Sequence, residues 1–130
     1  WEAINVISPA IVIIEYNARF GKDISVTVPY DRNFVRSHKH YSMIYFGASI
    51  RALCSLSEKK GYAFVGCGSA GINAFFVRRD LMVKEIRELT VEEGYVRNKF
   101  RESRNQDGKL IYLSQEEEYK LITSLPLDTV

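Results

Sequence analysis

The apolar residues near the start of the chain form an unbroken run rather than an alternating pattern. Residues 10–14 read Ala-Ile-Val-Ile-Ile, and their β-branched side chains favour an extended backbone. A strand that is apolar on both sides is typical of a parallel sheet covered by helices on both faces. Glu15, Tyr16 and Asn17 follow directly, so we expect these three residues at the carboxyl end of a buried strand.

Residues 49–60 have the spacing of an amphipathic helix. Apolar side chains recur every three or four positions between Ile50 and Leu56, which gives one apolar stripe. Ser49 can cap the first turn with its hydroxyl group. Gly61 can end the helix in the left-handed conformation that glycine adopts without strain. The pattern therefore predicts one helix in the middle of the chain.

Two further strands are predicted over residues 62–65 and 73–77. The order strand, helix, strand favours a parallel pair joined by a right-handed crossover. The connection over residues 66–72 is too short for a crossover helix, so the third strand should run antiparallel to the second. The expected fold class is α/β: a partial doubly wound Rossmann-like sheet, made of a parallel pair and an antiparallel hairpin strand, with a helical C-terminal tail.

The two ends of the chain have weaker patterns. Trp1 and Ile4 have the spacing of the last turn of a helix, and residues 80–89 have that of a weak helix. A capping box at residues 114–117 predicts a helix that ends near Ile122. We divide the chain into an α/β part over residues 1–83 and a helical or irregular C-terminal extension over residues 84–130.

Composition excludes several classes of protein. The chain has 130 residues, of which 46% are hydrophobic, and a net charge of +2, so it is one globular domain with its own core. No apolar run approaches the ~20 residues of a membrane span. A charge near neutrality gives no electrostatic argument for nucleic acid. We therefore expect neither a membrane nor a nucleic acid as partner.

Cysteine and histidine positions do not indicate a metal site or a disulfide framework. Cys54 and Cys67 lie outside metal-binding or disulfide spacings, which favours reduced cysteines and a cytoplasmic location. His38 and His40 are two residues apart, but the sequence offers no third ligand at a suitable position. We predict no metal.

The candidate site lies at the end of the first strand. Ligands of open α/β sheets bind beyond the carboxyl ends of the parallel strands. The predicted topology brings Glu15, Tyr16, Asn17 and Asn73 to one rim, together with the glycine-rich turn over residues 66–71. The alternative for Glu15 is a structural role, as a helix cap or as the ion-pair partner of Arg19.

The glycine-rich turn and the long connection have two interpretations each. Residues 66–71 match the GxGxxG dinucleotide pattern, but that chemistry needs a helix after the loop, and residues 73–77 favour a strand instead. The connection over residues 19–47 is long enough for a lid, and Tyr30 and Asp31 lie in its centre. Its aromatic side chains equally suit a small cluster sealed beneath the loop.

Three stretches together resemble the C-terminal half of Rossmann-like class I S-adenosylmethionine-dependent methyltransferases, in the style of the FkbM-type group. Residues 12–17 are similar to the family's fifth strand with its polar end, residues 61–66 to the sixth strand, and residues 73–77 to the antiparallel seventh. The resemblance covers about residues 1–81. It implies transfer of a methyl group to a small acceptor, with Glu15 as the catalytic group. The acceptor-binding residues that it implies are Tyr16, Asn17, Tyr30, Asp31 and Asn73.

The resemblance does not extend to the cofactor site. The family's cofactor loop and its ribose-binding acid belong to earlier strands, which would precede Trp1. We therefore expect no S-adenosylmethionine contact within this chain, and the N-terminal half of the same protein as the missing partner. An exposed edge on residues 10–14 would recruit either that half or a second copy, forming a homodimer. The alternative to a methyltransferase is a non-catalytic α/β interaction module.

Overall fold

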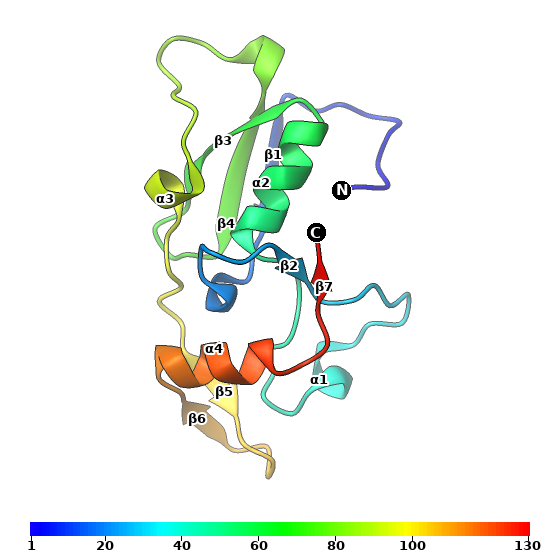
Figure 1. The fold of residues 1–130 in the computed structure, drawn as a ribbon, viewed down its shortest axis with the longest axis vertical. Coiled ribbons are helices and arrows are strands. Elements are labelled where there is room, and N and C mark those ends of the chain that lie inside the picture. Colours follow the sequence, from blue (N-terminus) through cyan, green and yellow to red (C-terminus); the bar gives the residue numbers. More distant parts are fainter.

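The computed structural model of the chain describes all 130 residues. Its main sheet contains β1 (Ile11–Glu15), β3 (Tyr62–Cys67) and β4 (Asn73–Arg78), in the order β1-β4-β3. Helix α2 (Ile50–Lys59) lies against this sheet and, with it, makes up one end of the elongated molecule (Figure 1). Most of the shorter elements make up the other end, whereas η2 (Arg79–Leu81) and α3 (Val91–Gly94) lie beside the sheet.

The predicted parallel pair is wrong. β4 lies between β1 and β3 and pairs antiparallel with both, and the two smaller sheets are antiparallel too. The reason lies in the residues of β4, which are apolar on both faces from Ala74 to Val77. Such a strand is stabilised best at the centre of a sheet, and the short turn after β3 delivers it there. A Rossmann-like parallel sheet is therefore not what this chain forms.

The strands and the central helix were otherwise located correctly. Ser49 caps α2, since its Oγ accepts a hydrogen bond of 3.2 Å from the amide of Ala52. Gly61 follows the helix with a φ angle of 78°, the left-handed conformation expected there. β1 and β3 run in the same direction although they are not neighbours, because each is antiparallel to β4. Their carboxyl ends therefore lie at one end of the sheet.

Helix α2 covers only one face of the sheet. Val12 and Ile14 of β1 lie on this covered face, opposite Phe76 and Ala74 of β4. Phe76 and Ala74 belong to the main core cluster, and Val12 and Ile14 pack against it. The cluster also includes Ile50, Leu53, Tyr62, Phe64 and Val91. The neighbouring residues of β1, Ile11 and Ile13, lie on the opposite face, with 57% and 59% of their surface exposed.

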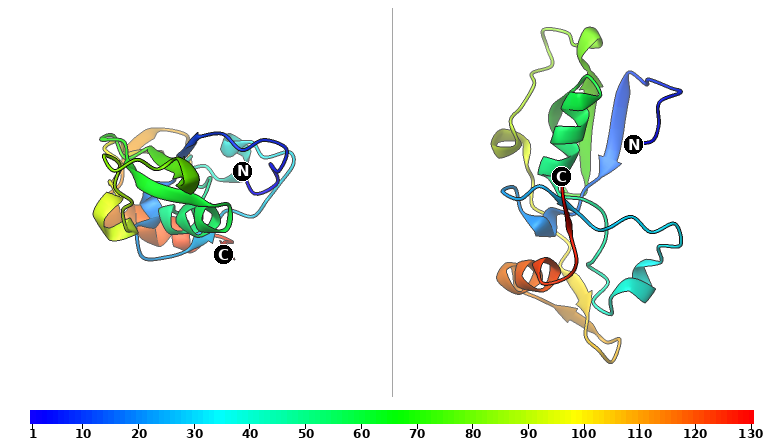
Figure 2. Two further views of the ribbon diagram at one scale, coloured as in Figure 1. Left: turned by 90° about the horizontal axis from the view of Figure 1, so that it is seen from above. Right: turned by 45° about the vertical axis from the view of Figure 1, so that its right-hand side comes forward.

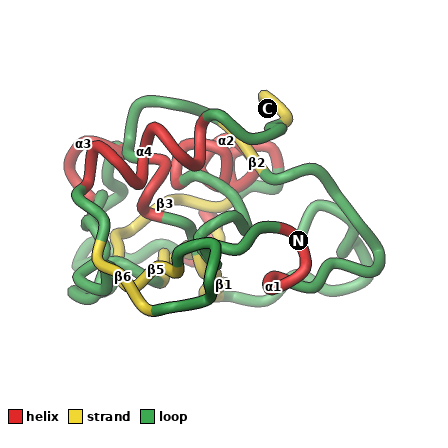
Figure 3. Tube along the Cα trace, turned by 90° about the horizontal axis from the view of Figure 1, so that it is seen from below, coloured by secondary structure: helices red, strands yellow, loops and turns green.

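The second half of the molecule contains short elements linked by long loops, as Figure 3 shows. A second small core contains Phe20, Val26, Tyr45 and Ile122. Two small sheets form here, β2 with β7 and β5 with β6. The elements of this half are η1 (Ala18–Phe20), β2 (Val26–Thr27), α1 (Arg36–Lys39), β5 (Glu102–Arg104), β6 (Leu110–Tyr112), α4 (Gln115–Thr123) and β7 (Asp128–Thr129).

Two predicted helical segments are not helices. Residues 1–9 contain no helix, and only the three-residue η2 forms within the segment that the sequence assigned to residues 80–89. The chain instead continues to the outer side of β3, where the amide of Leu89 donates a 2.8 Å hydrogen bond to the carbonyl of Phe64. By contrast, α4 begins at its predicted capping box, in which Ser114 and Glu117 bond each other's backbone amides.

The C-terminal extension packs against residues near the end of β1 and along the long connection. Strand β7 pairs with β2, and α4 packs against η1. A buried ion pair joins the two segments, with Nε of Arg19 2.8 Å from Oε1 of Glu118. Arg19 also donates to the carbonyl groups of Phe100 and Glu102. No helix of the structure has the length and apolar character needed to cross a membrane.

We predict that Glu118→Ala destabilises the fold by about 3–5 kcal/mol, because it leaves the buried Arg19 guanidinium without its counter-charge. The side chain of Glu118 is only 1% exposed. Glu116→Ala is the matched control, since Glu116 pairs with Lys120 on the exposed side of the same helix. Urea unfolding followed by circular dichroism measures both variants. Equal midpoints for the two would contradict a structural role for the Arg19–Glu118 pair.

Candidate functional site

A polar pocket of about 200 Å³ lies at the carboxyl end of β1, where the sequence placed the rim. β1 contributes Glu15, and the adjoining residues Tyr16 and Asn17 follow it into the wall of the pocket. The long connection and the C-terminal extension supply the other walls. The lining residues are Glu15, Tyr16, Asn17, Ala18, Arg19, Arg36, Phe46, Gly71, Ile72, Asn98, Phe100 and Glu102.

Glu15 presents a free carboxylate at this pocket. It is exposed, and it pairs in register with Asn73 of β4 on the open face of the sheet. Arg19, the alternative partner suggested by the sequence, is bonded to Glu118 instead. The structure therefore brings Glu15 and Asn73 together and leaves the Glu15 carboxylate available to a ligand.

Arg36 supplies a positive charge to the same pocket, and the sequence did not indicate it. Its guanidinium lies 3.9 Å from the centre of the Phe46 ring, and its Nε donates to the carbonyl of Met43. Its two terminal nitrogens have no protein partner. Burial and the nearby Arg19 lower the pKa of Arg36, whereas the Glu15 carboxylate opposes that shift. The pocket thus holds the Glu15 carboxylate and the Arg36 guanidinium, which do not bond each other.

Tyr16 and Asn17 serve the architecture of the pocket. The Tyr16 hydroxyl donates to the carbonyl of Val96, and burial raises the pKa of Tyr16 above its usual range. Nδ2 of Asn17 donates to the carbonyls of Ile44 and Phe46 over 2.8 and 3.0 Å. Both side chains therefore bond backbone groups of the surrounding loops and hold the pocket walls in place.

Tyr30 and Asp31 lie away from the rim. They line a separate depression of about 170 Å³ with Phe34 and Gly47. Tyr30 is 90% exposed, and the Asp31 carboxylate lies 2.6 Å from Nζ of Lys39. That contact lowers the pKa of Asp31. The structure does not bring these two residues to the pocket that contains Glu15.

Asn98 and Glu102 join the pocket from the C-terminal extension. Nδ2 of Asn98 donates to the carbonyl of Phe100, while its Oδ1 is buried and has no hydrogen-bond partner. No sequence pattern marked these residues, because they reach the rim only through tertiary contacts. One such contact is the hydrogen bond from the amide of Lys99 to the carbonyl of Ala70 in the glycine-rich turn.

The sequence predicted a strand after the glycine-rich turn, and the structure confirms it: the turn leads into β4. Gly71 adopts a φ of 70°, and the backbone of the extension passes directly over it. A Cβ atom at Gly71 would lie 2.3 Å from the carbonyl oxygen of Arg97. This close approach holds the extension, and with it Asn98, against the rim.

Comparison with known proteins gives no relative for this chain: it matches no family model, no curated protein and no solved structure.

We predict that Gly71→Ala destabilises the fold by at least about 2 kcal/mol, because left-handed strain adds to the collision with Arg97. Gly108→Ala is the control. Gly108 has a similar φ of 76°, but a Cβ there meets no atom within 4 Å, so we expect only the backbone cost of about 1 kcal/mol. Urea midpoints compare the two variants. A Gly71→Ala variant no less stable than Gly108→Ala would show that the extension does not pack on the turn.

Proposed function

We propose that this chain forms the acceptor-binding side of an S-adenosylmethionine-dependent methyltransferase that acts on a small polar acceptor. The observation that carries the proposal is the unpaired Glu15 carboxylate, placed at the carboxyl end of a strand in a pocket of about 200 Å³. The sequence resemblance supplies the reaction class. The pocket supplies the residues that would hold the acceptor.

Glu15 and Arg36 would bind different groups of the acceptor molecule. A carboxylate accepts a hydrogen bond from an acceptor hydroxyl or amine, and it can take the proton that this group loses on methylation. The terminal nitrogens of Arg36 can bind an anionic or carbonyl oxygen of the same acceptor. Stacking on Phe46 fixes the plane of the guanidinium, so it is oriented before an acceptor binds. The acceptor that fits has a hydrogen-bond donor and an acceptor oxygen.

The residues of this chain do not fit the cofactor itself. The rim pocket is smaller than the 300–1,000 Å³ typical of sites for such ligands, and charged and amide groups line much of it. S-adenosylmethionine would supply the methyl group, but its binding residues would lie outside these 130 residues. The missing N-terminal half of the same protein is the partner that the resemblance implies.

The free edge of β1 favours a second candidate, a non-catalytic interaction module. An unpaired strand edge with apolar side chains is a surface for another strand and requires no chemistry at the rim. The two candidates differ at Glu15, which matters for turnover in the first and for nothing but surface charge in the second.

We also propose a cytoplasmic location. Both cysteines are free, and burial raises the pKa of Cys54 to about 12. Thiols with a raised pKa are poor nucleophiles and suit a structural role in a reducing compartment.

The first test is calorimetric titration of S-adenosylmethionine into the 130-residue chain. We expect no binding heat, because the pocket at Glu15 is too small and too polar for the cofactor. A dissociation constant in the micromolar range would contradict this expectation. It would also place the cofactor site within the chain.

The second test is Glu15→Gln in the protein that carries the cofactor site. We expect a loss of methyl-transfer rate of about 10²–10⁴-fold, the usual contribution of a general base, with an unchanged urea midpoint because the side chain is exposed. Glu85→Gln is the control, since Glu85 is an exposed carboxylate next to Lys84 and outside the pocket. Normal turnover by the Glu15 variant would favour the interaction module.

A further inference from the structure

The outer edge of β1 has an unused row of backbone hydrogen-bonding groups. The amide of Tyr16 donates to Ile72, and that of Arg78 donates to Ala10. In an antiparallel pair of strands, every second residue exchanges hydrogen bonds with the neighbouring strand. The even-numbered residues of β1 therefore bond to β4. The amides and carbonyls of Ile11, Ile13 and Glu15 therefore point outward. In the right-hand view of Figure 2, β1 is the outermost strand on its side of the sheet.

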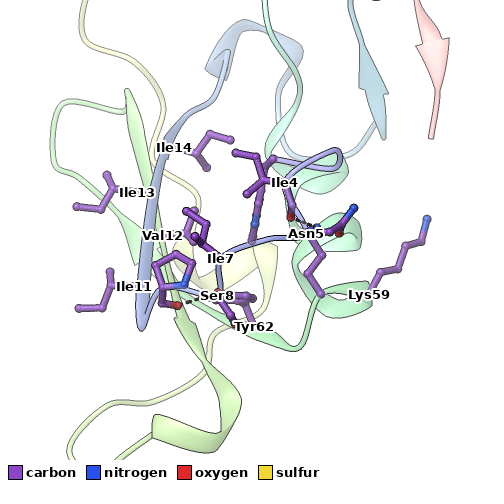
Figure 4. Close-up of a pocket in the computed structure, with 13 residues that line it drawn as sticks. Ile4, Asn5, Ile7, Ser8, Ile11, Val12, Ile13, Ile14, Lys59 and Tyr62 are labelled. Atoms are coloured by element: carbon purple, nitrogen blue, oxygen red, sulfur yellow. Dashed lines mark hydrogen bonds between the residues drawn. The ribbon is translucent and has the colours of Figure 1, made fainter.

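An apolar groove runs along this edge. It has a volume of about 610 Å³, three times that of the rim pocket, and eight of its 13 lining residues are hydrophobic. Figure 4 shows Val12 and Ile14 pointing toward Ile4 and Ile7 of the N-terminal segment. Lys59 and Lys60 also line the groove. The side chains of Val12, Ile14, Ile4 and Ile7 give the groove its apolar character.

The other side of the same strand is apolar too. Ile11 and Ile13 point away from the groove in Figure 4 and remain more than half exposed. A strand that covers this edge therefore meets apolar side chains on both of its faces. Its own side chains must be apolar on both faces, which excludes an ordinary amphipathic strand.

We propose that the occupant of this edge is β1 of a second copy of the chain, paired antiparallel about a two-fold axis at Ile13. β1 is itself apolar on both faces from Ile11 to Ile14. A second β1 is therefore the kind of strand that this edge requires. In this register Ile13 pairs with Ile13 and Ile11 with Glu15 of the second copy. Each outward amide and carbonyl of these three residues then finds a partner.

Side chains and charges suit the same arrangement. Val12 lies opposite Ile14 of the second copy, so both grooves receive apolar side chains at the same time. Antiparallel pairing also keeps the two Glu15 carboxylates apart, at opposite ends of the paired strands. The two-fold closes the assembly, and it removes the exposed edge from both copies. This pairing concerns the 130-residue chain, and no step of it requires methyl transfer.

The decisive experiment measures the mass of the 130-residue chain by sedimentation velocity, for the unchanged chain and two variants. We expect a dimer for the unchanged chain, and a folded monomer for Ile13→Lys, because two like charges then lie opposite each other. Val83→Lys is the control, with a comparably exposed apolar residue away from the edge; it should stay dimeric. Circular dichroism confirms that each variant is folded.

A second variant, Ile13→Cys, tests the register directly. Directly opposed residues of a hydrogen-bonded antiparallel pair have Cα atoms about 5.5 Å apart, within the range that a disulfide spans. We expect mild oxidation to give a covalent dimer from Ile13→Cys and not from Val83→Cys. A monomeric unchanged chain, or a dimer that survives Ile13→Lys, would overturn the proposal. Large polydisperse assemblies would overturn the closed two-fold.

Discussion

The fold depends on the pairing of β4 on both of its edges. β4 brings together the N-terminal strand and the strand that follows α2, although β1 and β3 do not touch each other as neighbours. Phe76 at its centre is fully buried and packs against Phe64 and Trp1. Without β4 in this position, β1 would have no partner, and the carboxyl end of β1 would not meet the glycine-rich turn.

The walls of the rim pocket are held together by side chains whose hydrogen-bonding groups already have protein partners. Asn17 holds two carbonyls of the long connection, and Arg19 holds the extension through Glu118 and two further carbonyls. These buried contacts fix the walls from which Glu15 and Arg36 reach the pocket. Buried residues thus hold the pocket walls in place, while the charged groups of Glu15 and Arg36 remain free to bind a ligand.

Local sequence patterns predicted where the helices and strands lie better than they predicted which strands pair with each other. The apolar run of β1, the stripe and caps of α2, and the capping box of α4 each depend on residues close in sequence. The position of β4 depended on competition between two possible neighbours for β1, which no local pattern records. At the site, Glu15 followed from the end of a strand, and Asn73 from the hairpin. Arg36 and Asn98 could not be predicted, because loops bring them to the rim.

The ion pair between Arg19 and Glu118 joins residues 99 positions apart, which has a consequence for how the chain folds. Contacts of such long sequence separation require closure of a large loop before they contribute any stability, and they slow folding. The sheet with α2 needs only residues up to about Arg78, whereas the pocket needs residues beyond position 100. The half with the sheet can therefore form before the pocket, whose walls need the extension in place.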